Sequence, residues 1–364
     1  AVTDGERNIT YKDLNQRVSS LATGLQKLGI EKDDRVVLQL PNTLEFIEAC
    51  FALFRIGALP IFSLPSHRFN EISYFCKFSE AKAYIIPDVN SGFDYRLLAQ
   101  QVKEDVLNLQ HVIVVGNAQS FIPFKDLYIE EKLKENHVQG SDVAFLQLSG
   151  GSTGISKLIP RTHNEYMYTL KMSVECCELT ADSVFLVVLP IAHNYPMSSP
   201  GILGTIYAGG RIVLSASPSP DVAFPLIEKE KVTMVSLVPP LALQWLEIRT
   251  KRQQDLSSLE VIQVGGAKFS AEAAQRITPT FKCKLQQVFG MAEGLVNYTR
   301  LNDSDELVIN TQGKPMSPHD EIRVVDDEDK DLPIGEVGHL LTRGPYTIQG
   351  YYKAPEHNTK AFTI

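Results

Sequence analysis

The sequence predicts an α/β protein with two mainly parallel sheets flanked by helices and a small antiparallel β lobe. Short apolar runs of strand length alternate with segments of helical periodicity, which favours parallel strands joined through helices. These runs are too numerous for one sheet of ordinary size, so two sheets are expected. After about residue 300, turns rich in Asp, Gly and Pro separate short apolar segments, which is typical of antiparallel strands.

The first two helices are marked in the sequence. Thr10, with Asp13 three residues later, resembles a capping box, and apolar residues then recur at spacings of three and four until Gly29. A second helical pattern covers residues 45–56 and stops at Gly57. Apolar runs predict strands at 35–40, 59–64, 83–86, 111–115, 143–148, 184–189, 211–214, 232–238, 259–264 and 285–289.

Two regions follow from this order of elements. Residues 1–300 are expected to form an α/β core of two sheet-containing subdomains, which carries the ligand sites. Residues 301–364 are expected to form a small β-rich subdomain, with strands at 321–325 and 338–342.

Composition and patterning exclude several classes of partner. The formal net charge is −8 and no basic stripe is present, so nucleic acid binding is not expected. No apolar run approaches the ~20 residues that span a bilayer, and the amino end lacks the regions of a signal peptide, so a cytoplasmic protein is expected. The five cysteines are odd in number and irregularly spaced, which favours reduced thiols over disulfides or metal sites.

A stretch rich in glycine and serine, QLSGGSTGISK at 147–157, overlaps the end of the apolar run 143–148. A helix-like segment begins near Asn164, and glycine-rich turns between a strand and a helix offer backbone N–H groups to phosphate. The stretch fits neither common nucleotide fingerprint, because Lys157 stands three residues beyond Gly154 and no G-x-G-x-x-G spacing occurs. Taken alone, it is either a different phosphate loop or a plain surface connection.

Further unusual stretches follow this loop in order. They are LIPRTH at 158–163, HNYPMSSPG at 193–201, GGAKFS at 265–270, FGMAEG at 289–294, QGKP at 312–315 and RGPYTIQGYY at 343–352. The ordered set resembles the adenylate-forming superfamily of acyl and aryl acid ligases over essentially the whole chain. Within that superfamily, the sequence is similar to the aryl acid activating enzymes of siderophore assembly.

The resemblance implies ATP and Mg²⁺ as cofactors. The glycine-rich loop would close over the β and γ phosphates, where its donors stabilise the charge that builds on departing pyrophosphate. Glu293, at the exit of a strand, would hold Mg²⁺ together with Thr153 and phosphate oxygens, although a solvated loop glutamate is the alternative. The implied phosphate-loop residues are Ser149, Gly150, Gly151, Ser152, Thr153, Gly154 and Lys157.

The family places adenine in a slot beside small residues that follow a strand. Phe289 would stack on the other face of the ring, where the family usually has Tyr, and the backbone around Val288 would meet the adenine amino group. The family often has Thr before the metal-binding glutamate, and Ala292 at that position gives room to an aromatic acid instead. An ordinary turn after a strand is the alternative. The implied nucleotide residues are Gly265, Gly266, Ala267, Val288, Phe289, Gly290 and Ala292.

The stretch that begins at residue 193 implies the acid site. In the resembling ligases the residue that matches Asn194 bonds the 2-hydroxyl group of the acid, and the one that matches Ser199 meets the 3-hydroxyl group. A buried Asn and Ser need partners, so this pair favours 2,3-dihydroxybenzoate over salicylate, with a plain polar turn as the alternative. The residues implied are His193 and Lys157 for catalysis, and His193, Asn194, Tyr195, Ser199, Ala292 and Val296 for acid binding.

The reaction that the resemblance implies is formation of an aryl adenylate from 2,3-dihydroxybenzoate and ATP. The aryl group would then pass to the phosphopantetheine thiol of an aryl carrier protein. The mobile carboxyl-terminal lobe of the family, with the main catalytic lysine, is expected beyond residue 364, so this chain alone is expected to be severely impaired. A salicylate-activating enzyme, a coenzyme A ligase and a non-catalytic ligand-binding protein on the same fold remain alternatives.

Overall fold

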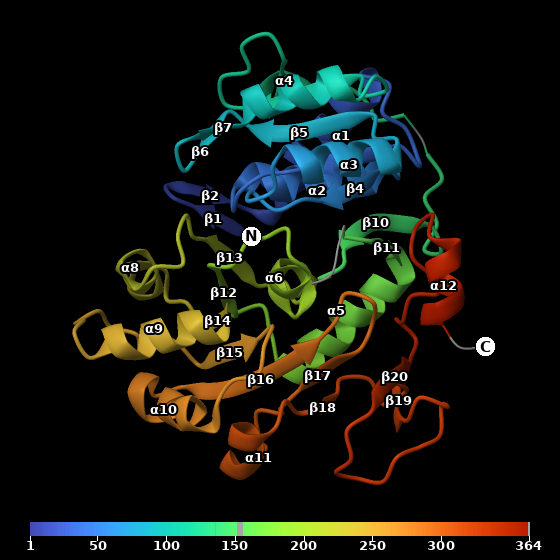
Figure 1. Ribbon diagram of the computed structural model, residues 1–364. Coiled ribbons are helices and arrows are strands. Elements are labelled where there is room, and N and C mark those ends of the chain that lie inside the picture. The colour runs from blue at the N-terminus through green and yellow to red at the C-terminus, as the bar shows by residue number, and fades with distance from the viewer. Residues whose placement is uncertain (135, 151–155, 363–364) are drawn as a thin grey trace.

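Two large, mainly parallel sheets with helices around them make up most of the protein (Figure 1). The structure, a computed structural model, describes residues 1–134, 136–150 and 156–362. The α/β class with two sheets, expected from the alternation of apolar runs and helical segments, is confirmed.

The larger sheet has the strand order β18-β17-β16-β15-β14-β12-β13-β1-β2. Its strands from β16 to β1 are parallel, and β17, β18 and β2 add antiparallel edges. Val2 pairs with Ile212, so the beginning of the chain joins a sheet built mostly from its second half. The strands are β1 (Val2–Asp4), β2 (Arg7–Ile9), β12 (Val184–Val187), β13 (Arg211–Leu214), β14 (Met234–Leu237), β15 (Val261–Gly265), β16 (Lys284–Gly290), β17 (Val296–Tyr298) and β18 (Lys314–Pro315).

The smaller sheet has the strand order β11-β10-β4-β3-β5-β8-β9, and all of its strands except β11 are parallel. A separate two-stranded ribbon, β6 (Val89–Asn90) with β7 (Phe93–Asp94), lies outside it. The strands of the smaller sheet are β3 (Arg35–Leu38), β4 (Leu59–Phe62), β5 (Ala83–Pro87), β8 (His111–Val115), β9 (Ile122–Pro123), β10 (Val143–Leu148) and β11 (Leu158–Thr162).

Helices cover the sheets in layers. The main apolar core joins α1 and α2 to both sheets, and a second core lies under α3 and α4 on the other face of the smaller sheet. No helix in the described ranges is long and apolar enough to cross a membrane. The helices are α1 (Tyr11–Lys27), α2 (Leu44–Ile56), α3 (Phe69–Ser79), α4 (Tyr95–Asp105), α5 (His163–Cys177), α6 (Asn194–Ser198), α7 (Gly201–Tyr207), α8 (Pro220–Glu230), α9 (Pro239–Arg249), α10 (Ala271–Phe281), α11 (Asp305–Asn310), α12 (Pro355–Ala361) and a 3-10 turn at Phe124–Leu127.

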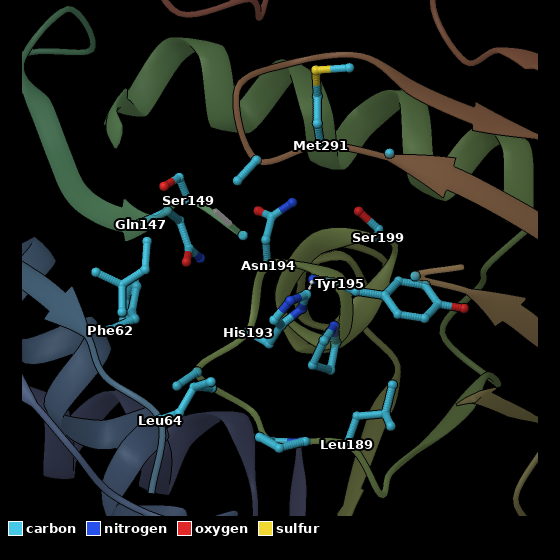
Figure 2. A pocket seen from close by; sticks show the side chains of 18 of the residues that line it. Phe62, Leu64, Gln147, Ser149, Leu189, His193, Asn194, Tyr195, Ser199 and Met291 are labelled. Carbon is cyan, nitrogen blue, oxygen red and sulfur yellow. Dashed lines mark hydrogen bonds between the residues drawn. The ribbon is translucent and has the colours of Figure 1, made fainter. Parts of the chain in front are cut away.

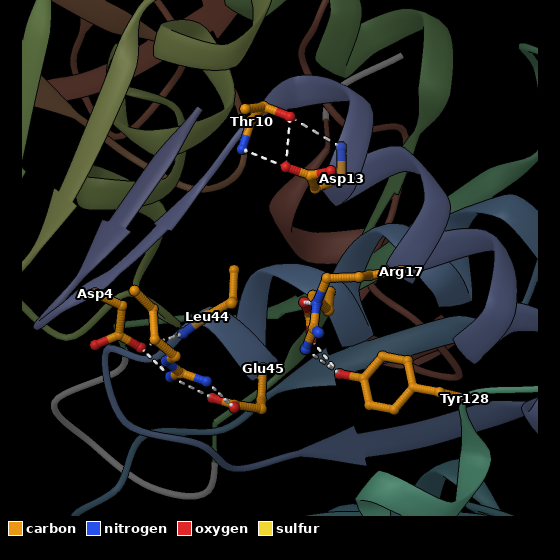
Figure 3. Close-up of polar contacts among 9 residues, drawn as sticks. Asp4, Thr10, Asp13, Arg17, Leu44, Glu45 and Tyr128 are labelled. Carbon is orange, nitrogen blue, oxygen red and sulfur yellow. Dashed lines mark hydrogen bonds and ion pairs between the residues drawn. The ribbon is translucent and has the colours of Figure 1, made fainter.

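The predicted ends of the first two helices are confirmed. The Thr10 hydroxyl oxygen accepts from the N–H of Asp13, and the Asp13 carboxylate accepts from the N–H of Thr10, so α1 begins with a capping box (Figure 3). Gly57 has a φ of +75° directly after α2, a conformation that glycine adopts without a steric cost.

Polar contacts tie the first strand of the larger sheet to a helix of the smaller one (Figure 3). The Asp4 carboxylate accepts a hydrogen bond of 2.9 Å from the N–H of Leu44, at the start of α2. Arg7 pairs with both Asp4 and Glu45. The two sheets are therefore held together by directional bonds as well as by the shared core.

The glycine-rich stretch lies in a different setting from the one expected. Residues 158–162 form β11, antiparallel to β10, so the stretch connects two strands of a hairpin and not a strand and a helix. Pro160 is compatible with β11 because β11 is an edge strand, where a missing N–H group costs no ladder bond. The helix expected near Asn164 is confirmed, because α5 begins at His163, but β11 stands between the loop and this helix, so the helix does not follow the loop directly.

The antiparallel strands expected after residue 300 are confirmed, as β19 (Glu321–Val325) paired with β20 (His339–Arg343). The same segment also contains the helices α11 and α12, which were not expected. Ser304 caps α11 and Pro355 begins α12, two residue types that favour helix starts. Because β18 pairs with β17, the chain leaves the larger sheet after β18 and not at residue 300.

Candidate active site

A cavity of about 830 Å³ lies where the carboxyl ends of parallel strands from both sheets meet (Figure 2). Its walls come from the residues at or just after the ends of β4 and β10 in the smaller sheet and of β12, β14, β15 and β16 in the larger sheet. Ligands of open α/β sheets bind at this edge. The position and volume of the cavity make it the candidate active site.

Most of the predicted site residues meet at this cavity. The predicted phosphate-loop residues Gly151, Ser152, Thr153 and Gly154 lie outside the described residues. The predicted residues that line the cavity are Ser149, Gly150, His193, Asn194, Tyr195, Ser199, Gly266, Val288, Gly290, Ala292 and Glu293.

Five described residues of the prediction are not part of the lining. Side chains alternate along a strand, and Phe289 stands between the lining residues Val288 and Gly290 of β16. Val296 pairs with Gly290 on the neighbouring strand and packs behind it. The stacking role of Phe289 and the ring contact of Val296 stay predictions. The residues outside the lining are Lys157, Gly265, Ala267, Phe289 and Val296.

Gly265 makes room for a side chain of the protein itself. A methyl group at this position would lie 2.9 Å from the carbonyl oxygen of Val288 and 3.0 Å from Cζ of Tyr195. The Tyr195 ring is buried, and this burial raises the pKa of its hydroxyl group. Tyr195 therefore fills the space beside Gly265, whereas Gly266 faces the cavity with a φ of +83°.

His193 opens the short helix α6. Its Nδ1 accepts a hydrogen bond of 3.2 Å from the N–H of Tyr195, so the neutral ring carries its proton on Nε2. The ring borders the cavity, and the surrounding protein lowers the pKa of His193 by desolvation. A neutral His193 can donate from Nε2 to a carboxylate in the cavity.

The side chain of Asn194 is held by α5. Its Oδ1 lies 2.7 Å from the hydroxyl group of Tyr166, which also lies 2.8 Å from Oγ of Ser198. Burial raises the pKa of Tyr166 to about 12, so its hydroxyl group stays protonated. With Oδ1 engaged, the amide NH₂ group of Asn194 is available to a ligand.

Ser199 borders the same side of the cavity as Asn194 (Figure 2). Its side chain is buried, and its hydroxyl group forms no hydrogen bond to any residue in the described part of the chain. A buried hydroxyl group that faces a cavity gains a partner when a polar ligand enters.

The two ends of the glycine-rich loop are bonded to each other. The N–H of Ser149 donates to the carbonyl oxygen of Lys157 over 2.9 Å, and the N–H of Lys157 donates to Oγ of Ser149 over 2.9 Å. Ser149, Gly150 and Ser156 line the cavity. The loop therefore leaves and re-enters the sheet at the wall of the site.

Glu293 is the one acidic residue among those that line the cavity. Within the described ranges, no group of three or more His, Cys, Asp and Glu residues could hold a metal ion. Mg²⁺ is commonly held by one or two carboxylates together with substrate phosphates and water. A single carboxylate beside a glycine-rich loop is compatible with that mode, in which nucleotide phosphates would be the remaining ligands.

Arg161 joins three segments of the site. Its guanidinium group is buried and donates to the carbonyl oxygen of Ala292 over 2.6 Å and to that of Tyr346 over 2.8 Å. Burial lowers the pKa of Arg161, and the two carbonyl oxygens offset part of the cost of burying the charge. Arg161 therefore fixes the turn before Glu293 to β11 and to the segment around Tyr346.

Several functional residues were missed because no local pattern marks them. Asn42 donates to the carbonyl oxygen of Leu189 over 3.0 Å and accepts from the N–H of Ile191 over 2.9 Å, so it fixes the segment that leads to His193. His67 also lines the cavity, and its Nδ1 lies 2.9 Å from Oγ of Ser63. The signal that could have found residues 62–67 is position, because they follow the end of β4 at the shared edge.

The fold and the site together define a class of enzyme that binds a nucleotide next to a small polar ligand. Residues 1–352 match the family model of AMP-binding enzymes, and the chain belongs to this family. The resemblance that the ordered motifs indicated is therefore confirmed. Enzymes of this family use ATP as a substrate.

Relatives with similar sequences extend this result. The chain is 64% identical to the 2,3-dihydroxybenzoate-AMP ligase of Bacillus subtilis, over 100% of this chain and 67% of that protein. It is 42% identical to the salicyl-AMP ligase / salicyl-S-ArCP synthetase of Mycobacterium tuberculosis, over 98% of this chain and 64% of that protein. The apo structure of MbtA from Mycobacterium smegmatis superposes with a TM-score of 0.92 and 42% identity, over 98% of this chain and 66% of that one. The chain thus spans about two thirds of the length of these relatives.

Proposed function

We propose that this chain binds ATP and 2,3-dihydroxybenzoate and forms the site where the acid becomes its adenylate with release of pyrophosphate. The identity of 64% to a 2,3-dihydroxybenzoate-AMP ligase over the whole chain supports this proposal. The cavity supports it as well, because the two ends of the glycine-rich loop, the Glu293 carboxylate and a polar pocket all border it.

The observation that carries the choice of acid is the pair Asn194 and Ser199 on one side of the cavity. Asn194 offers an amide donor to the 2-oxygen of an aromatic acid, and Ser199 offers a hydroxyl group to the 3-oxygen. An acid without the 3-hydroxyl group would leave Ser199 unpaired, which costs about 1–3 kcal/mol for a buried polar group. The pair therefore favours 2,3-dihydroxybenzoate over salicylate.

The reaction needs the acid carboxylate to attack the α-phosphorus of ATP while pyrophosphate leaves. His193 orients the carboxylate from Nε2, and the Ser149 hydroxyl group, which borders the cavity and accepts from the N–H of Lys157, offers its own hydrogen to the departing phosphates. Glu293 would hold Mg²⁺ together with phosphate oxygens, and the bound cation would supply charge neutralisation on those phosphates. The apolar part of the lining, with Leu189 and Val238, limits water around the mixed anhydride product.

In the full-length protein, we propose transfer of the aryl group to the phosphopantetheine thiol of an aryl carrier protein. The relative in Mycobacterium tuberculosis, whose name includes a salicyl-S-ArCP synthetase, supports this step. Coenzyme A is the competing acceptor. Supplying each thiol with the preformed adenylate and measuring the thioester by mass spectrometry distinguishes the two.

An acid panel tests the proposed function. We expect acid-dependent exchange of pyrophosphate into ATP by the full-length protein to be fastest with 2,3-dihydroxybenzoate, slower with salicylate and slowest with benzoate. Ser199→Ala should reduce the difference in exchange rate between 2,3-dihydroxybenzoate and salicylate. Asn194→Ala should reduce the difference in exchange rate between salicylate and benzoate. Equal rates for benzoate and 2,3-dihydroxybenzoate would show that the roles of Asn194 and Ser199 are wrong.

A further inference from the structure

Tyr351 lies behind the wall of the cavity and contacts Glu293 from outside it. Its hydroxyl group donates to Oε1 of Glu293 over 3.0 Å. Tyr351 itself is not among the residues that line the cavity, whereas Glu293 is. The hydroxyl group therefore binds one oxygen of a carboxylate that borders the cavity, although Tyr351 does not border the cavity itself.

The same ring contacts the end of the glycine-rich loop. The Nζ atom of Lys157 lies 5.4 Å from the centroid of the Tyr351 ring, within the range of a cation–π interaction. One side chain thus touches the acidic residue and the basic residue that the proposed function assigns to Mg²⁺ and to phosphate. It places them next to each other without lining the cavity.

The backbone of Tyr351 is fixed on both sides. Asn358 of α12 accepts from its N–H over 2.8 Å and donates to its carbonyl oxygen over 3.0 Å, which forms a reciprocal pair. The next residue, Tyr352, donates from its N–H to the carbonyl oxygen of Leu158 over 2.9 Å. These bonds anchor the segment to β11, so the position of the Tyr351 hydroxyl group is determined by the fold.

The chemistry of the pair fixes the direction of the bond. An ionised carboxylate can only accept hydrogen bonds, so the Tyr351 hydroxyl group is the donor to Glu293. A carboxylate that binds a cation is normally oriented by such a hydrogen bond to its second oxygen.

We propose that Tyr351 is a positioning residue for the divalent cation, because it fixes the Glu293 carboxylate through Oε1 and leaves Oε2 for the metal. This inference rests on the proposed function, since it takes Glu293 as the metal-binding residue. It adds to that function a residue that sets how tightly the nucleotide-bound cation is held.

The test uses the whole 364-residue chain and measures binding, not turnover. ATP binding is titrated by calorimetry at increasing Mg²⁺ concentrations for the wild type and for Tyr351→Phe. We expect the Mg²⁺ concentration for half-maximal ATP binding to rise about 10- to 100-fold in the variant, the usual effect of losing a partner of a metal ligand. ATP affinity in EDTA and the affinity for 2,3-dihydroxybenzoate should stay unchanged.

Tyr352→Phe is the matched control. It removes the neighbouring hydroxyl group, which forms no hydrogen bond to another residue in the ranges described, and it should behave like the wild type. An unchanged Mg²⁺ requirement in Tyr351→Phe would overturn the inference, and so would an equal rise in Tyr352→Phe. A wild-type chain that binds ATP equally well with and without Mg²⁺ would instead show that the metal role of Glu293 is wrong.

Discussion

The hydroxyl group of Tyr166 lies 2.7 Å from Oδ1 of Asn194, although the two residues belong to different helices. This bond fixes which end of the Asn194 amide faces the cavity. Under the proposed function, the selectivity for the acid would therefore depend on a tyrosine that lies outside the lining.

Loss of this bond should weaken the binding of 2-hydroxy acids. In Tyr166→Phe, Asn194 is free to rotate, and we expect the Kd for 2,3-dihydroxybenzoate to rise roughly 2- to 10-fold, which corresponds to a hydrogen bond of about 0.5–1.5 kcal/mol. Calorimetric titration measures the Kd for 2,3-dihydroxybenzoate and for benzoate. Benzoate has no 2-hydroxyl group, so its affinity should change little. Tyr168→Phe is the control. Tyr168 lies on the same helix as Tyr166, and its hydroxyl group is bonded to Ser317. An equal loss for both acids would contradict the role of Tyr166.

Acid should destabilise the fold through His193. Desolvation lowers the pKa of the folded-state imidazole, so the unfolded chain binds more protons as the pH falls below about 6.5. The stability is therefore complete above that pH and decreases below it, and protonation also removes the Nδ1 acceptor that caps α6. Half-buried His67, His111 and His163 act in the same direction, because desolvation lowers the pKa of each.

His193→Asn separates this contribution from the others. Asparagine caps a helix without titrating, so the variant should show a smaller decrease in melting temperature between pH 8 and pH 5 than the wild type. Thermal unfolding followed by circular dichroism gives both curves. Identical pH dependence in the two proteins would mean that His193 does not contribute.

Substitution of Gly265 should reduce the stability of the fold and should not act directly on nucleotide binding. In Gly265→Ala the new methyl group would meet Tyr195 and the carbonyl oxygen of Val288, so we expect a loss of about 1–3 kcal/mol in the free energy of unfolding. Urea unfolding measures this loss. Gly150→Ala, at a position where a methyl group would meet no atom of the described residues within 4 Å, should be almost neutral. A stable Gly265→Ala chain with weakened ATP binding would favour the adenine slot expected from the family.

Removal of Asn42 should loosen the segment that leads to His193. Asn42→Ala leaves the N–H of Ile191 and the carbonyl oxygen of Leu189 without these partners, at a cost of about 1–3 kcal/mol for each group that stays buried and unpaired. Acid affinity should decrease with stability, because His193 follows directly. Asn42→Asp keeps an acceptor for Ile191 but turns a second oxygen toward the carbonyl oxygen of Leu189, so its defect should be at least as large as that of Asn42→Ala. A clearly milder defect in Asn42→Asp than in Asn42→Ala would contradict this account.

Local signals predicted much of the fold. The cap at Thr10, the stop at Gly57 and the apolar runs of the parallel strands depend on neighbours in sequence, and the structure reproduces them. The strand β11 was missed because Pro160 and Arg161 interrupt its apolar pattern, and its pairing with β10 across an edge compensates for both. The helices after residue 300 were missed because they are too short to show periodicity.

The sequence predicted the site residues that belong to a motif. It did not predict the residues that hold those site residues in position. Asn194, Ser199 and Glu293 stand in recognisable stretches and reach the cavity. Tyr166 and Asn42 act through contacts between residues 28 or more positions apart, and such contacts exist only after both sheets have formed. No periodicity or spacing in the sequence encodes which side chains will meet across the two sheets.

The contact that Arg161 makes with position 292 leaves the side chain at that position free to vary. It holds position 292 only through the carbonyl oxygen, while the side chain of Ala292 lines the cavity. Every residue type has this carbonyl group, so the anchor does not depend on the side chain at position 292. The shape of the cavity can therefore be redesigned at this position while the adjacent Glu293 keeps its place. Under the proposed function, this would separate the choice of substrate from the residues that activate it.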